Sequence, residues 1–176
     1  MKYFRKIEGE KVYLSPMNIE DVEKYVEWLN NPNITQYLSI HNKMVDLISE
    51  TEFIEKNSKE EFLLAIIRSS DNVLLGNIRL SDIDYKSGTA TLGIFIGEEE
   101  NLSKGYGSEA IKLILSYAFN ELRLHNIMLN VYDMNERAKK AYQKCGFKEF
   151  GRRHGARYHD GKYSDIICME IVNDKI

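Results

Sequence analysis

The segment "NLSKGYGSEA", residues 101–110, places a basic side chain and two glycines directly before a long stretch of helical periodicity. Glycine lets a backbone approach a ligand closely, and the first amides of a helix have no acceptor within that helix. The helix dipole adds to the attraction for negative charge. Residues of this turn, Lys104, Gly105, Tyr106, Gly107 and Ser108, are therefore candidates for binding an anion.

Two other interpretations of the turn stay open from its residues alone. The glycines can serve only a tight turn before a helix. Residues 105–110 also fit the pattern G-x-G-x-x-A of dinucleotide-binding folds. However, hairpins precede the turn, and Asp133 lies too far along the chain to be the acidic residue of that fingerprint. A Walker A loop is excluded, because Lys104 precedes its glycine and no G-K-[ST] occurs.

A second segment that could carry chemistry is "MNERAKKAYQKCGF", residues 134–147. Asn135 is placed to cap a helix over 136–145, and Gly146 is placed to end it. Tyr142 falls on the apolar face of this helix, together with Ala138 and Cys145. The spacing alone favours a core tyrosine, but a buried hydroxyl needs a hydrogen-bond partner.

The elements around these segments predict how they are positioned. A helix capped by Asn18 and ended by "NNPN" precedes a mixed segment, 34–57, with a helix near its end. The order predicts an α+β fold: a mostly antiparallel twisted sheet with helices on both faces and a βαβ crossover that carries the glycine turn. Strands are expected at 11–14, 61–67, 73–80, 89–97, 126–132, 147–158 and 162–171, and the helix after the glycine turn at 106–122.

Three features resemble the GCN5-related N-acetyltransferase (GNAT) superfamily, in particular its branch of ribosomal-protein (RimJ/RimL-like) and spermidine-type small-amine acetyltransferases. "SKGYGSEA" is similar to the pyrophosphate loop Q/R/G-x-G-x-G/A of that family. "MNERAKKAYQKCGFKEFG" is similar to its block Asn-x-x-Ala-x-x-x-Tyr-x-x-x-Gly-Phe, and the order of elements agrees over essentially the whole chain. The resemblance implies the GNAT fold and an acetyl-CoA-dependent N-acetyltransferase that acts on a primary amine without a metal.

The resemblance also implies roles for individual residues. Tyr142 corresponds to the tyrosine that protonates the leaving thiolate. With reference pKa values of about 10 for tyrosine and about 8.5 for a thiol, that transfer is uphill by about 2 kcal/mol in isolation. Tyr37 lies where relatives contact the acceptor. Contacts to coenzyme A are implied for Phe95, Ile96, Gly97, Lys104, Gly105, Tyr106, Gly107, Ser108, Asn135 and Ala138.

The general base is the weakest match to the family. Relatives often carry a glutamate in the strand motif A-E-[IL]-G, whereas Thr91 stands at that position here. Glu98, which follows the strand, is the candidate base, with Glu99 and Glu100 as alternatives. Three glutamates before a loop are commonly only a solvated turn, and a proton can also leave through water.

The composition excludes several classes of function. The 176 residues fit one domain, 1–176, and a net charge of −3 gives no general attraction to nucleic acid or to a membrane surface. Two cysteines cannot form a disulfide framework, and four scattered histidines have no metal-ligand spacing. Charges interrupt every apolar run near the N-terminus, so we expect a cytoplasmic protein without a signal peptide.

The sequence leaves the acceptor open among a polyamine, an amino sugar, an aminoglycoside, an amino acid and a protein N-terminus. Acidic residues in the first helices are compatible with a cationic acceptor. The helical position of Cys145 favours burial, so we expect direct transfer in a ternary complex rather than an acetyl-cysteine. The alternatives are a non-catalytic sensor of coenzyme A or a nucleotide, and a dinucleotide-dependent oxidoreductase. Family members are often homodimers, although no feature of this sequence requires one.

Overall fold

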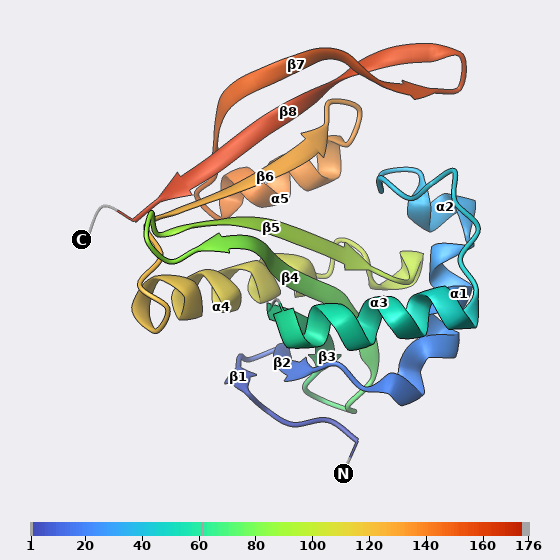
Figure 1. Ribbon diagram of the computed structural model, residues 1–176, viewed down its shortest axis with the longest axis vertical. Coiled ribbons are helices and arrows are strands. Elements are labelled where there is room, and N and C mark those ends of the chain that lie inside the picture. Colours follow the sequence, from blue (N-terminus) through green and yellow to red (C-terminus); the bar gives the residue numbers. More distant parts are fainter. Residues whose placement is uncertain (1, 61, 174–176) are drawn as a thin grey trace.

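One mixed sheet organises residues 2–60 and 62–173, the part of the chain that the computed structural model describes (Figure 1). Its eight strands lie in the spatial order β1-β2-β3-β4-β5-β6-β8-β7. Their bounds are β1 Ile7–Glu8, β2 Val12–Pro16, β3 Phe62–Arg68, β4 Leu74–Asp84, β5 Thr89–Ile96, β6 Asn126–Tyr132, β7 Lys148–His159 and β8 Lys162–Val172.

Neighbouring strands run antiparallel except for β5 and β6, which are parallel. Helix α4, Tyr106–Asn120, connects these two strands, as a parallel pair requires. The prediction of a mostly antiparallel sheet with one helical crossover is therefore confirmed. The sequence analysis missed β1, which is only two residues long.

The remaining helices are α1 Val22–Leu29, α2 Pro32–Thr35, α3 Leu47–Glu60 and α5 Glu136–Lys144, with short 3-10 turns η1 Ile19–Asp21 and η2 Glu99–Asn101. The Asn18 side chain accepts a hydrogen bond from the amide of Glu20, so it caps η1 directly before α1. "NNPN" does more than end α1. Asn31 caps the short helix α2 and Pro32 occupies its first turn, where no amide donor is needed.

Helices cover both faces of the sheet (Figure 1). The larger core lies between the sheet and α4, and Ile66, Ile78 and Ile114 are fully buried there. A second core, on the α1 and α3 side, contains Tyr25 and Trp28 together with other apolar residues of these helices, and a third cluster contains Tyr13 and Ile67. Apolar residues that follow one another along β2 and β3 point to opposite faces of the sheet, so neighbours such as Ile66 and Ile67 enter different clusters.

The parallel pair β5–β6 is short, and this positions the site. Only three register pairs join the two strands: Thr89–Asn126, Ala90–Ile127 and Thr91–Met128. Beyond Thr91, β5 remains paired with β4 up to Ile96, whereas β6 remains paired with β8. The sheet therefore opens between β5 and β6, as the diverging ribbons in Figure 1 show.

A close contact holds the far end of β5 against α1. An added Cβ atom at Gly97 would lie 2.1–2.4 Å from three ring atoms of Trp28, so only glycine allows the indole to lie here. The Trp28 ring also packs edge-on against Tyr25 and Phe95, at centroid distances of 5.6 and 6.1 Å. This aromatic group fixes the strand end that borders the opening.

We expect Gly97→Ala to destabilise the protein by about 2–3 kcal/mol, because the added methyl group overpacks a buried ring. Urea denaturation followed by circular dichroism measures this change. Gly151→Ala is the matched control, since its Cβ atom would lie 4.0 Å from the Cβ atom of Cys168, an ordinary contact. A Gly97→Ala variant as stable as Gly151→Ala would contradict the packing described for Trp28.

Candidate active site

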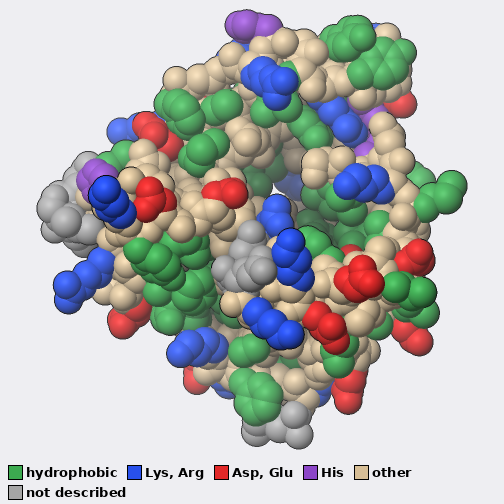
Figure 2. Space-filling model, viewed as in Figure 1, with side chains coloured by type: hydrophobic (Ala, Val, Ile, Leu, Met, Phe, Trp, Pro, Cys, Tyr) green, Lys and Arg blue, Asp and Glu red, His purple; other side chains and the backbone are tan. Residues whose placement is uncertain are grey.

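A cavity of about 820 Å³ fills the opening between β5 and β6. The surface is hollowed near the centre of the face shown in Figure 2. One group of lining residues surrounds the glycine turn and the start of α5: Asn101, Leu102, Ser103, Gly105, Tyr106, Gly107, Ser108, Asn135, Arg137 and Ala138. The other group surrounds the segment between α1 and α3: Leu29, Ile34, Tyr37, Leu38, Ile40, Lys43, Val45, Glu50 and Phe53.

The glycine turn presents free backbone donors at the cavity. Gly105 has a φ of 89°, a left-handed conformation that glycine adopts readily, and it serves as the N-cap of α4 without a side-chain cap. The first hydrogen bond of the helix runs from the amide of Glu109 to the carbonyl of Gly105, at 3.0 Å. The amides of Tyr106, Gly107 and Ser108 therefore have no acceptor within the helix. Such donors, with the positive end of the helix dipole, suit a phosphate group.

Gly107 brings this turn close to β5. A Cβ atom at Gly107 would lie 3.8 Å from the side chain of Ile96 and 3.9 Å from that of Ile94, both of which line the cavity. The space in front of Gly107 is therefore narrow, and it connects the turn with the diverging part of β5. The sequence-predicted residues Phe95, Ile96, Gly105, Tyr106, Gly107, Ser108, Asn135, Ala138, Tyr142 and Tyr37 all line this one cavity.

Three predicted site residues lie elsewhere. Gly97 contacts Trp28, and its amide already donates to the carbonyl of Leu75 at 2.8 Å. Lys104 borders a separate recess of about 320 Å³, where its carbonyl accepts a hydrogen bond from Lys11 Nζ.

Glu98, the predicted base, also does not line the cavity. Its carboxylate forms an ion pair with Lys24 of α1, at 2.9 Å. The chain lines the cavity up to Ile96, the last residue of β5, and again from Asn101 to Ser103, so Gly97 and Glu98 fall in the interval between.

Tyr142 is a buried side chain at the wall of the cavity, with 9% of its surface exposed. Burial raises its pKa to about 12, and the neighbouring Cys145 thiol adds to the effect. The ring packs edge-on against Phe147, and within the described residues its hydroxyl makes no hydrogen bond. The phenol is therefore neutral at physiological pH and can donate to a group in the cavity.

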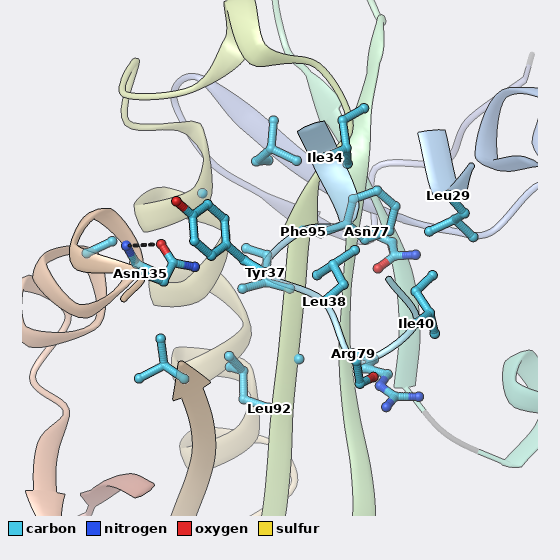
Figure 3. Close-up of a pocket in the computed structure, with 18 of the residues that line it drawn as sticks. Leu29, Ile34, Tyr37, Leu38, Ile40, Asn77, Arg79, Leu92, Phe95 and Asn135 are labelled. Atoms are coloured by element: carbon cyan, nitrogen blue, oxygen red, sulfur yellow. Dashed lines mark hydrogen bonds between the residues drawn. The ribbon is translucent and has the colours of Figure 1, made fainter. Parts of the chain in front are cut away.

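Asn135 has two functions available to its amide. Its Oδ1 atom accepts a hydrogen bond from the amide of Ala138 at 3.1 Å and thereby caps α5 (Figure 3). Its Nδ2 atom remains as a donor at the cavity wall. The predicted cap is confirmed, and a contact with a ligand does not compete with it.

Cys145 is half-buried on the inner side of α5. Its sulfur donates a weak hydrogen bond to the carbonyl of Ser108, at 3.5 Å, and burial raises the pKa of the thiol. Burial is the dominant effect on this pKa and keeps the sulfur protonated. The geometry therefore gives no activated cysteine nucleophile at this position.

The second end of the cavity is mostly apolar, with a few polar groups. Asn77 and Arg79 reach it from β4, next to Leu38 and Ile40 of the segment after α2 (Figure 3). Glu50 of α3 is buried at its wall, and Lys43 is exposed at its edge. An apolar chamber with few polar groups is typical of a small-molecule site.

Sequence reasoning missed Asn77, Arg79 and Glu50. The two strand residues alternate with buried apolar residues, a signal that marks a strand with one polar face but not a ligand site. Glu50 belongs to a helix with several acidic residues, and nothing in the pattern separates it from exposed neighbours such as Glu52.

No group of three or more His, Cys, Asp and Glu side chains is placed to hold a metal ion within residues 2–60 and 62–173. In the same part of the chain, no helix is long and apolar enough to cross a membrane. The groups that line the cavity are backbone amides, side-chain amides, the Glu50 carboxyl group, and the phenols and cations of Tyr37, Tyr106, Tyr132, Tyr142, Lys43, Arg79 and Arg137.

The comparisons with known proteins agree with this geometry. Residues 11–148 match the family model described as acetyltransferase (GNAT) domain. The spermidine N(1)-acetyltransferase of Vibrio cholerae is 30% identical over 83% of this chain and 84% of its own length. A probable N-acetyltransferase of Bacillus subtilis, YjcK, is 26% identical over 95% of this chain and 97% of its own.

Solved structures lead to the same family. The crystal structure of the Vibrio cholerae spermidine N-acetyltransferase in complex with CoA and spermine superposes with a TM-score of 0.83. It is 26% identical, and the match covers 95% of this chain and 98% of the other. The alternative of a dinucleotide-dependent oxidoreductase does not agree with these matches. Because the family model matches residues 11–148, which is most of the chain, the chain belongs to the GNAT acetyltransferase family, whose members use acetyl-CoA.

Proposed function

We propose that the protein transfers the acetyl group of acetyl-CoA directly to a small primary amine, with both substrates bound in the cavity between β5 and β6. The observation that carries this proposal is the continuity of that cavity. One space contains the free amides of the glycine turn, the side chain of Tyr142, and the apolar end of the cavity that Leu38 and Ile40 line. The named acetyltransferases among its relatives support the same reaction.

The glycine turn is the proposed pyrophosphate site. The amides of residues 106–108 lack intrahelical acceptors, and the dipole of α4, a 15-residue helix, favours negative charge in front of them. Lys104 does not line this cavity, so backbone donors rather than its ammonium group provide the main contacts. Binding therefore depends on the shape of the turn more than on its net charge.

The open edge of β5 is the proposed path of the pantetheine arm. From Leu92 to Ile96 this strand has register partners on β4 alone among the described strands, so one side of its backbone faces the cavity. Unpaired peptide groups need hydrogen bonds, and an extended amide-containing ligand can provide them. A donor on the same edge can also polarise the thioester carbonyl as negative charge develops on its oxygen.

Tyr142 is the proposed donor to the leaving sulfur. With its pKa near 12, complete proton transfer to a thiolate, whose reference pKa is about 8.5, is unfavourable by about 5 kcal/mol in isolation. A hydrogen bond that strengthens as the sulfur gains charge needs no complete transfer before the C–S bond breaks. Direct transfer follows, since Cys145 is a protonated, half-buried thiol.

The proposed function is tested by thiol release from acetyl-CoA with a panel of primary amines: alkyl monoamines, diamines and polyamines, amino sugars, aminoglycosides, amino acids and a peptide with a free N-terminus. We expect amine-dependent release with at least one class, and acetylated amine as the second product by mass spectrometry. Tight binding of CoA without thiol release for any class would instead support a sensor.

We expect Tyr142→Phe to lower kcat about 100-fold and to leave the KM for acetyl-CoA within about threefold, because the lost hydroxyl acts on the leaving sulfur. Steady-state kinetics with the best amine measures both constants. Tyr85→Phe, at an exposed tyrosine of the β4–β5 turn, is the matched control. Equal kcat values for Tyr142→Phe and Tyr85→Phe would mean that Tyr142 only packs in the core and has no role in catalysis.

We expect Gly107→Ala to weaken the binding of CoA about tenfold or more, which is about 1.4 kcal/mol, while the melting temperature stays near that of the wild type. The added methyl group meets Ile94 and Ile96 at ordinary distances, so the fold tolerates it, but it narrows the space before the turn. Isothermal titration calorimetry with CoA measures the affinity. Unchanged affinity would remove the glycine turn from the binding site.

A further inference from the structure

The Glu50 carboxyl group is a buried acid that the fold leaves without a partner. The residue is 5% exposed, lies in α3 and lines the cavity at its apolar end. Within the described residues, neither a hydrogen bond nor an ion pair satisfies its carboxyl group. It is also the single Asp or Glu among the described residues that line this cavity.

A second buried acid shows how the same fold treats such a group elsewhere. Asp21 is 4% exposed, and its carboxylate pairs with Lys2 at 2.6 Å and accepts hydrogen bonds from the hydroxyl of Tyr3. Buried carboxylates are expected to be paired in this way, because leaving water is costly for a charge. Glu50 is buried without such a pair, and it lies at a cavity wall where a bound ligand can supply the partner.

The surroundings of Glu50 connect it with the reactive part of β5. The pKa of Tyr25 of α1 is raised mainly by burial, and the negative charges of Asp21 and Glu50 add to it; the Tyr25 hydroxyl donates to the carbonyl of Gly76 at 3.3 Å. The Tyr25 ring packs edge-on against Phe95, with 6.2 Å between the centroids. Phe95 lies on the diverging part of β5 and lines the same cavity as Glu50.

Glu50 can change its charge near neutral pH. Burial raises the pKa of Glu50 to about 7 and that of Tyr25 well above its usual value of 10. Lys43 and Arg79 also line the cavity, and within the part of the chain that the structure describes no ion pair joins either of them to Glu50. A carboxyl group poised in this range is suited to accept a proton at physiological pH.

We propose that Glu50 is the catalytic group that binds the ammonium form of the acceptor amine in this chamber and takes its proton. This inference rests on the proposed acetyl transfer. The ammonium group provides the missing partner of the buried carboxylate, and the apolar walls around it receive the carbon skeleton of the amine. Glu50 thereby replaces Glu98, which the sequence suggested as the base and which is paired with Lys24.

The proton balance of the step is simple. One N–H bond of the ammonium breaks, and an O–H bond forms on Glu50, which leaves a neutral amine with a free electron pair. That pair forms the new C–N bond at the thioester carbon, and the C–S bond breaks. Tyr142 donates its proton to the sulfur. The nitrogen then gives up a second proton, which restores the phenol of Tyr142. Glu50 releases the first proton to water. One acetylamide, one thiol and one released proton result.

The test compares Glu50→Gln with the wild type, using the best amine of the panel. We expect kcat/KM at pH 7.5 to fall about 100-fold, with the affinity for CoA unchanged by calorimetry. The wild-type profile of kcat/KM should rise with pH through an inflection near 7, and this inflection should be absent from the variant. Glu52→Gln, at an exposed position of the same helix, should behave as the wild type.

Stability provides a separate check that the variant is folded. Because the folded-state pKa of Glu50 is raised, wild-type stability is lost as the pH rises from about 4.5 through 7. Glu50→Gln should therefore melt roughly 3–8 °C above the wild type at pH 8.5 and close to it at pH 4.5. If the variant fails to fold, the wild-type pH profile alone still tests the proposal, since a profile without an inflection near 7 contradicts it.

The outcomes separate this inference from the proposed function. If wild type and Glu50→Gln have equal kcat/KM and pH profiles, the enzyme stands and the role of Glu50 is wrong. A loss of activity that is equal at every pH and accompanied by weaker CoA binding would assign Glu50 a structural role. If the wild type releases no thiol, calorimetry with the amines is the deciding measurement. Amine binding to the wild type that Glu50→Gln abolishes would support the ammonium site without the acetyl transfer. No amine binding to the wild type would overturn both proposals.

Discussion

The structure depends on the early separation of two parallel strands. β5 and β6 share three register pairs and then follow different neighbours, β4 and β8. Every part of the candidate site is placed by this separation. It exposes one edge of β5, it leaves room for the cavity, and it brings α4 and α5 to the same side of the opening. A parallel pair of full length would close the sheet and remove the site.

The parts of the fold with strong local signals could be predicted from the sequence. β6 was expected at 126–132 and is found there, and α5 ends one residue before the expected end. The resemblance to the family linked the glycine turn, Asn135 and Tyr142, and the structure places all three at one cavity. These signals come from residues close together in sequence, namely caps, glycines and periodic apolar positions.

The acceptor end could not be predicted, because distant segments build it. Glu50 differs from Glu52 in the side of α3 that it occupies, and that side is decided by packing against both α1 and β3. The position of Glu98 outside the cavity lining was hidden from the sequence for a related reason. Its place directly after β5 suggested that it could reach the reacting groups, but Gly97 packs against Trp28 and the Glu98 carboxylate pairs with Lys24, contacts between segments distant in sequence.

The three-pair junction between β5 and β6 also divides the molecule mechanically. Strands β1–β5 form one antiparallel unit, and β6, β8 and β7 form another, joined by that junction and by α4. A ligand that spans the opening bonds to both units at once. Occupancy therefore adds a cross-link where the native ladder is shortest, and it should merge two units of local unfolding into one cooperative transition.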